Sequence, residues 1–177
     1  KKKKEIFFST YFCHPSMAND NLSGLSVLNL LIKFLKQFDS LKYSYRFVML
    51  PETIGSIAYL SKKYKDLKKN VICGFNLSCL GTSEEFSFVK TRYGDKLCDE
   101  ALEAALINKN TKIYSYLERG SDERQYCHPQ IDLPICNFSR KKFHDFKEYH
   151  TSADNLRFIT KKGLDESFQI LKNIILF

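Results

Sequence analysis

Two short side chains that can bind a metal, His14 and Asp20, stand six residues apart in the segment 12–24. A hydrolytic zinc centre needs about three protein ligands and an open position for water. It also needs a carboxylate that takes the proton of that water. His150 is the candidate for a third ligand, and Glu52 is the candidate base. Taken singly, each residue also fits an ordinary role, such as a loop histidine or a helix cap.

Secondary structure must bring these residues together. Helical spacing of apolar residues predicts helices at 22–38, 56–64, 95–108 and 164–176. Asp20 or Asn21 can cap the first helix, and we expect Asp20 to combine the roles of cap and ligand. Apolar, β-prone runs predict strands at 5–13, 43–50, 71–80, 85–91, 113–117 and 133–138.

This alternation predicts an α/β fold, a three-layer αβα sandwich with a mostly parallel mixed sheet. Ligands of such sheets bind beyond the carboxyl ends of the strands. The polar loops expected at that edge are 14–20, 51–55, 76–81, 120–124 and 149–154. The candidate ligands and the candidate base all fall within these loops.

The composition is that of a folded domain. The 177 residues are 44% hydrophobic and 14% aromatic, which is enough for one hydrophobic core. No apolar run reaches the roughly 18 residues of a membrane span, and no secretory signal is visible, so we expect no membrane partner. The chain starts inside a strand-like run and ends on Ile174–Phe177, so we expect residues 1–177 to be one catalytic domain of a longer chain.

The cysteines and the charges also limit the function. Six cysteines form no C-x-x-C pair, which indicates reduced, buried thiols and a cytoplasmic protein. The net charge of +8 is spread over short lysine runs, including Lys1–Lys4. A nucleic-acid partner would need a concentrated basic face, so none is expected. The sequence leaves the oligomeric state open.

Taken together, the motifs resemble the zinc aminopeptidase superfamily (peptidase clan MH), which includes bacterial leucyl aminopeptidases and glutaminyl cyclases. His14 and the Asp20–Gly24 segment match its first motif, and Glu52 matches the first Glu of its Glu-Glu-x-Gly. The segment 121–123 matches its Ser-Asp-His loop in part, and Tyr149–Asp154 matches Tyr-His-x-x-x-Asp in full. The resemblance implies that Glu52 is the general base. It further implies zinc ligands at His14, Asp20 and His150 and a substrate contact at Asp122. Arg124 could bind a substrate carboxylate or pair with Glu123, and Asn76 is a further candidate for substrate contact.

The sequence also departs from the family pattern. Thr53 stands where the family has a second Glu that binds a second zinc, and Asn76 stands where an Asp binds the first. Ser16 replaces the Asp that usually orients the first His. Because Thr and Asn are poor zinc ligands, we expect one zinc ion, held by His14, Asp20 and His150.

The variant motifs are similar to those of a bacterial aminopeptidase-like subgroup that is often encoded among polysaccharide biosynthesis genes. The expected function is metal-dependent hydrolysis of amide bonds, most simply removal of an N-terminal residue from a small peptide. One alternative is a deacylase or cyclase-like enzyme that acts on a non-peptide amide in surface-polysaccharide metabolism. Another is a non-catalytic binding module with a degenerate metal site.

Overall fold

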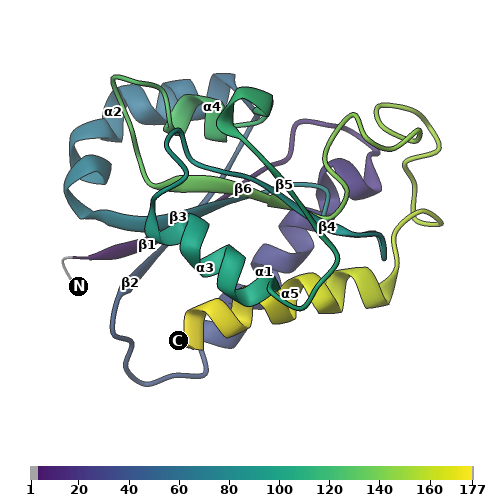
Figure 1. Cartoon of the computed structure of the whole chain (residues 1–177), viewed down its shortest axis with the longest axis horizontal. Helices are drawn as coiled ribbons and strands as arrows, with labels where there is room; N and C mark the ends of the chain where they lie inside the picture. Colours follow the sequence, from purple (N-terminus) through teal and green to yellow (C-terminus); the bar gives the residue numbers. More distant parts are fainter. Residues whose placement is uncertain (1–3, 177) are drawn as a thin grey trace.

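A six-stranded sheet organises the chain, and the computed structural model describes it over residues 4–176 (Figure 1). Residues 1–3 and 177, with most of the first lysine run, lie outside the described part. The strand order is β2-β1-β3-β6-β4-β5, and neighbours run parallel except for the antiparallel pair β4 and β6. The strands are β1 (Glu5–Tyr11), β2 (Ser44–Leu50), β3 (Val71–Leu77), β4 (Phe86–Val89), β5 (Thr111–Tyr114) and β6 (Ile135–Ser139).

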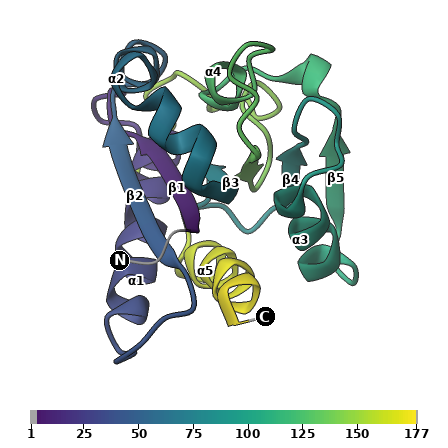
Figure 2. The ribbon, with the colours of Figure 1, turned by 90° about the vertical axis from the view of Figure 1, so that its left-hand side faces the viewer.

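Helices cover both faces of this sheet (Figures 1 and 2). Helices α1 (Ser23–Leu35), α3 (Leu97–Leu106) and α5 (Lys161–Leu176) pack on one face, and α2 (Ile54–Asn70) and α4 (Glu123–Tyr126) lie on the other. Alternate residues of β1 face opposite layers, since Phe8 packs with α1 and Phe7 packs with Leu60 of α2. The predicted three-layer αβα sandwich with a mixed sheet is therefore confirmed.

Strand β1 shows why its sequence is apolar without alternation. Six of its seven residues are buried, because helices cover both sides of a central strand. Each fully buried Phe of this strand contributes about 1.5–3 kcal/mol relative to an exposed one. The carboxyl end of β1 is thereby held firmly against β2 and β3, which deliver the next two loops of the candidate site.

Three elements differ from their predictions. Helix α2 extends well past residue 64 because Leu60 and Leu67, seven residues apart, are both buried. The predicted strand 113–117 is displaced to β5, and residues 116–118 form a 3-10 turn in which the Glu118 carboxylate accepts the Ser115 N–H. The segment 119–124 is not simply a polar loop, since residues 121–123 are buried and α4 begins at Glu123.

All six cysteines are free thiols, and five of them are buried. The prediction of buried thiols is wrong for Cys13, which is exposed at the carboxyl end of β1. Among the described helices, none combines the length and the apolar character that a membrane span requires.

Candidate metal centre

The loops at the carboxyl ends of the strands bring His14, Asp20 and His150 together. One ligand atom from each of these residues lies within 4.8 Å of the others. The contact between His150 Nε2 and Asp20 Oδ2 is 3.1 Å long. Ligands bound to zinc at about 2.0–2.2 Å in a tetrahedral site stand about 3.3–3.6 Å apart, so these residues could close around one ion with small adjustments.

The carboxylate of Asp20 is suited to bind a metal, because one of its two oxygens accepts no hydrogen bond. Asp20 is 1% exposed, and Oδ2 has no hydrogen-bond partner among the described residues despite its contact with His150. A buried acceptor without a partner costs about 1–3 kcal/mol. The other oxygen, Oδ1, accepts the hydroxyl of Tyr11. A cation between Oδ2 and the two imidazoles would satisfy the free oxygen.

The helix-cap role predicted for Asp20 is wrong. Asp20 lies in a short π-helical turn, Ala18–Leu22, and the peptide bond between Asp20 and Asn21 is cis. Helix α1 starts after this turn, and the Gly24 N–H donates to Asn21 Oδ1 at 3.2 Å. Asn21, and not Asp20, thus accepts an N–H of the first turn of α1, while Asp20 Oδ2 contacts His150.

The remaining polar residues of the first motif hold the loop after β3. Three successive backbone N–H groups of that loop donate to side chains of the motif. The bonds are Cys79 to Asn21 Oδ1 (3.0 Å), Leu80 to Ser23 Oγ (2.8 Å) and Gly81 to Asn19 Oδ1 (2.8 Å). These side chains therefore join the ends of β1 and β3, and only Asp20 presents a free oxygen to the site.

The two histidines differ in exposure. The His14 side chain is 20% exposed and that of His150 is 48% exposed, while their ring centroids are 5.0 Å apart. His150 stacks on Tyr149 and has a φ of 55°. A left-handed backbone costs a residue other than glycine about 1–3 kcal/mol, and such strain tends to occur at functional sites. Both rings remain open to water and to a ligand.

Glu52 stands beside this cluster. Its Oε2 is 4.0 Å from His14 Nε2, and its Oε1 accepts the hydroxyl of Ser121 at 2.6 Å. The backbone N–H of Glu52 donates to Cys13 Sγ at 3.1 Å. Burial raises the pKa of Glu52 to about 7, partly opposed by the Ser121 hydrogen bond and supported by the Asp122 charge. A carboxyl group with this pKa can both take and return a proton near neutral pH.

Asn76 reaches Glu52 only through Ser121. Asn76 is fully buried, and its Nδ2 donates to Ser121 Oγ at 3.1 Å. Since Nδ2 can only donate, the Ser121 hydroxyl must use its own proton for Glu52. The substrate contact predicted for Asn76 stays a prediction. The observed hydrogen bond indicates that Asn76 orients the Ser121 hydroxyl, which in turn holds Glu52.

Asp122 supports the first turn of α2. Its Oδ1 accepts the Thr53 N–H and the Ser56 hydroxyl, both at 2.8 Å, and the residue is fully buried. Burial raises the pKa of Asp122, and the hydrogen bonds of Thr53 and Ser56 and the Arg124 charge oppose this rise. Its other oxygen has no hydrogen-bond partner among residues 4–176. The predicted substrate contact of Asp122 is untested by this arrangement.

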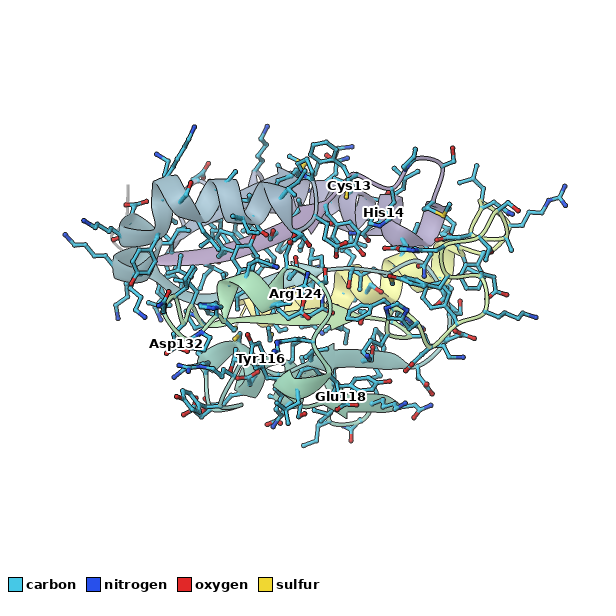
Figure 3. The ribbon with its side chains drawn as sticks, turned by 90° about the horizontal axis from the view of Figure 1, so that it is seen from above. Cys13, His14, Tyr116, Glu118, Arg124 and Asp132 are labelled. Atoms are coloured by element: carbon cyan, nitrogen blue, oxygen red, sulfur yellow. The ribbon has the colours of Figure 1, made fainter. Side chains whose placement is uncertain are left out.

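Arg124 is the exposed member of the predicted substrate contacts. Its Nη2 donates to Thr53 Oγ1 at 3.2 Å, so the hydroxyl at the position of the family's second metal-binding Glu is already engaged. Figure 3, which looks onto the layer of α2 and α4, shows Arg124 between His14 and Tyr116 in that view. Its hydrogen bond to Thr53, the residue after Glu52, connects Arg124 to the loop that carries the candidate base.

A second group of possible ligands, Cys98, Asp99 and Cys136, lies in the core. Both oxygens of Asp99 are engaged, by the N–H and hydroxyl of Thr91 and by the Lys96 N–H. All three residues are fully buried, which leaves no path for water. This group is a packed core, and the His14 cluster is the candidate metal centre of the described residues.

Sequence reasoning missed four residues that hold this centre: Tyr11, Cys13, Ser121 and Asp154. Ser121 and Asp154 belong to motifs that resemble the family, but the motifs carry no sign of what these side chains contact. Tyr11 looks like one more apolar strand residue, and Cys13 like a core thiol. Their roles depend on contacts between loops, which residue spacing does not reveal.

Comparisons with known proteins agree with this geometry. The family described as a domain of unknown function, DUF4910, matches residues 1–177. A protein of Clostridium acetobutylicum, named for polysaccharide biosynthesis with an aminopeptidase-like domain, is 40% identical over 175 residues. That alignment covers 98% of this chain and 40% of the relative, so the chain spans less than half of the relative's length.

Solved structures share the fold. The crystal structure of a peptidase-like protein from Clostridium acetobutylicum has a TM-score of 0.93 at 38% identity, and the match covers 99% of this chain and 41% of that chain. BSAP, a zinc aminopeptidase from Bacillus subtilis, has a TM-score of 0.79 at 21% identity, with 97% and 45% covered. A glutaminyl cyclase of Porphyromonas gingivalis has a TM-score of 0.73 at 16% identity, with 98% and 71% covered. The resemblance predicted from the motifs is confirmed, and a peptidase-like domain is supported.

Proposed function

This chain belongs to the DUF4910 family, and we propose that it is the aminopeptidase-like part of a metal-dependent hydrolase of amide bonds. The observation that carries the proposal is the meeting of His14, Asp20 and His150 within 4.8 Å, with the Glu52 carboxylate beside them. Two imidazoles, a carboxylate with a free oxygen and a neighbouring base are the parts that hydrolysis at a metal requires. The metal we propose is a single zinc ion.

His14, Asp20 and His150 would hold the ion, and Thr53 would not take part. When bound there, zinc would supply Lewis acidity toward the attacking water and the scissile carbonyl. Thr53 Oγ1 accepts a hydrogen bond from Arg124, and a neutral hydroxyl is a weak ligand beside imidazole and carboxylate. Tyr11 supports the ligand set by donating its hydroxyl to the second oxygen of Asp20.

Glu52 would move the proton. In the reaction, the water oxygen bonds to the carbonyl carbon, the carbon–nitrogen bond breaks, and the leaving nitrogen gains a proton. Glu52 Oε2 lies 4.0 Å from His14 Nε2 and so faces the place where the water would react. It takes the water proton there and passes it to the leaving amine. Ser121 keeps the other oxygen of Glu52 fixed during both transfers.

Zinc content and activity of the full-length protein test this proposal. Elemental analysis should find one zinc per chain in the wild type and in Glu52→Gln. Hydrolysis of aminoacyl p-nitroanilides and dipeptides should fall by about 10²–10⁴-fold in Glu52→Gln, because only the base is lost. His14→Ala and His150→Ala should each lose the zinc. A protein that binds no zinc refutes the hydrolase, and zinc retained by either histidine variant refutes the single shared ion.

The second candidate is a deacylase or cyclase-like enzyme that acts on a non-peptide amide. The glutaminyl cyclase fold and the words polysaccharide biosynthesis in the relative's name favour this candidate. It uses the same zinc ligands and the same base, and it differs in the substrate. Zinc binding together with complete inertness toward aminoacyl substrates would favour it over the aminopeptidase.

A further inference from the structure

A groove of about 630 Å³ lies along α2 and is lined by residues of α2, of α4 and of the segment that follows α4. Apolar side chains from two segments, Ile57 and Leu60 of α2 and Ile131 after α4, form part of its wall. The other lining residues are Ser61, Tyr64, Arg124, Gln125, His128 and Gln130. A volume of this size is typical of small-molecule sites, which are mostly apolar with a few polar groups.

The charge of the groove is concentrated at one point. Arg124 is the one permanently charged residue among those that line it, and the described residues give it no ion-pair partner. Its single hydrogen bond as a side-chain donor goes to Thr53 Oγ1. A guanidinium has five N–H donors, arranged to match a carboxylate. The Arg124 charge also acts on the buried Asp122 carboxylate, but the guanidinium forms no ion pair among the described residues and keeps unused N–H donors, so the groove is complementary to an apolar ligand with one anionic group.

The position of Arg124 relates this ligand to the reaction. Arg124 binds Thr53, which directly follows Glu52, so the cation marks the end of the groove nearest the base. Glu52 must face the leaving nitrogen in order to protonate it. In an α-amino acid, the carboxylate is two bonds from that nitrogen, and the side chain starts from the carbon between them. A leaving amino acid could therefore reach Arg124 with its carboxylate and the groove with its side chain.

We propose that this groove binds the leaving part of the substrate, namely an apolar α-amino acid whose free carboxylate pairs with Arg124. The inference rests on the proposed amide hydrolysis and names its substrate class: small amides that release an amino acid such as leucine. Burial of an apolar side chain contributes affinity, and the guanidinium selects for the carboxylate.

Calorimetric binding to the zinc-loaded, full-length Glu52→Gln protein, which lacks the proposed base, tests the groove without turnover. The variants below are made in the same background. The probes are leucine, leucinamide, which lacks the carboxylate, and glycine, which lacks the side chain. Leucine should bind at least about tenfold more tightly than either, which corresponds to about 1.4 kcal/mol. In Arg124→Gln, leucine and leucinamide should bind equally, and Ile57→Ser should weaken leucine while leaving glycine unchanged. Ile54→Ser is the matched control, since Ile54 is exposed on the same helix and does not line the groove.

Each outcome decides the inference. Equal binding of leucine and leucinamide by the Glu52→Gln protein, a carboxylate preference that survives Arg124→Gln, or equal weakening by the two isoleucine variants overturns it. Activity then separates it from the proposed function. A protein that cleaves aminoacyl amides without any carboxylate preference keeps the hydrolase and loses the groove. If the protein prefers ligands with a free carboxylate but hydrolyses no amide, the ligand site is supported and the proposed hydrolase is refuted.

Discussion

The carboxylate of Asp154 accepts the backbone N–H of Asp20 at 3.0 Å, across 134 residues of sequence. Its second oxygen accepts the Asn19 N–H at 2.6 Å, and its carbonyl accepts the Ala18 N–H at 3.2 Å. The loop that carries His150 is thereby bound to the turn that carries Asp20. This junction, and not the spacing of either motif, sets the distance between the two candidate ligands.

Asp154→Asn should weaken zinc binding without removing a ligand. An amide can accept one of the two N–H groups, but its own NH₂ would oppose the other. We expect a loss of zinc affinity of about 10–100-fold, as for other residues that orient ligands, in competition against a chelator. Ser152→Ala is the control, because Ser152 is exposed in the same loop and its backbone carbonyl, which the substitution keeps, accepts the Asn155 amide. Unchanged affinity in Asp154→Asn would show that the junction does not position the site.

Ser121→Ala should change the pH dependence of hydrolysis. Burial raises the pKa of Glu52, and the Ser121 hydrogen bond lowers it. Without that bond the pKa of Glu52 rises further, and the base is protonated at higher pH. Because activity needs the ionised base, the acidic limb of the kcat/KM profile should move upward by about one pH unit. Ser40→Ala, in an exposed connection, should leave the profile in place, and an unmoved limb in Ser121→Ala would contradict the proposed link.

Glu123→Gln should flatten the pH dependence of stability. Glu123 is fully buried, and burial raises its pKa, although its Oε1 accepts the N–H groups of Gly120 and Ser121. The folded protein therefore holds this proton more tightly than the unfolded chain does. The free energy of unfolding then falls as the pH rises above about 4.3. The slope reaches at most about 1.4 kcal/mol per pH unit, which corresponds to one proton.

A glutamine keeps an oxygen for both N–H groups and does not titrate. Urea unfolding at pH 5 and pH 8 should show that Glu123→Gln gains stability relative to wild type as the pH increases. Glu100→Gln, on the exposed side of α3, serves as the control and should run parallel to wild type. A parallel course for Glu123→Gln as well would mean that this carboxyl group contributes nothing to the pH dependence.

Gly24→Ala should destabilise the protein although alanine favours helices. A Cβ at residue 24 would lie 2.6 Å from side-chain atoms of Asn21 and Thr10. Both residues are buried, and Asn21 Nδ2 donates to Thr10 Oγ1 at 2.7 Å, so neither side chain can move freely. We expect a loss of about 1–3 kcal/mol, which outweighs the helix-propensity gain of about 1 kcal/mol. Thermal and urea unfolding would measure it, with the exposed Ser26→Ala on the same helix as control. An unchanged free energy of unfolding would show that the contact relaxes at no cost.

Local patterns of apolar and polar residues were enough to predict most of the fold. The apolar runs identified five of the six strands of the sheet. The inner strands β1, β3, β4 and β6 are covered on both faces and are therefore largely apolar. The amphipathic spacing identified α1, α3 and α5, and the position of polar loops after strands gave the edge where the site lies. The predictions for β5 and α4 were wrong, because short segments take their conformation from their neighbours. An example is the turn at residues 115–118, where the Glu118 carboxylate accepts the Ser115 N–H.

The sequence by itself determined the chemical types at the site: His14, Asp20 and His150 as possible ligands and Glu52 as a possible base. Only the tertiary structure decided which atoms are free, because hydrogen-bond partners come from loops far apart in sequence. Asp20 and Asp154 illustrate this, since both are carboxylates in matched motifs. One keeps a buried oxygen without a hydrogen bond, and the other uses both oxygens to bind the backbone. Residue type fixes what a side chain can do, and packing fixes which of those contacts it makes.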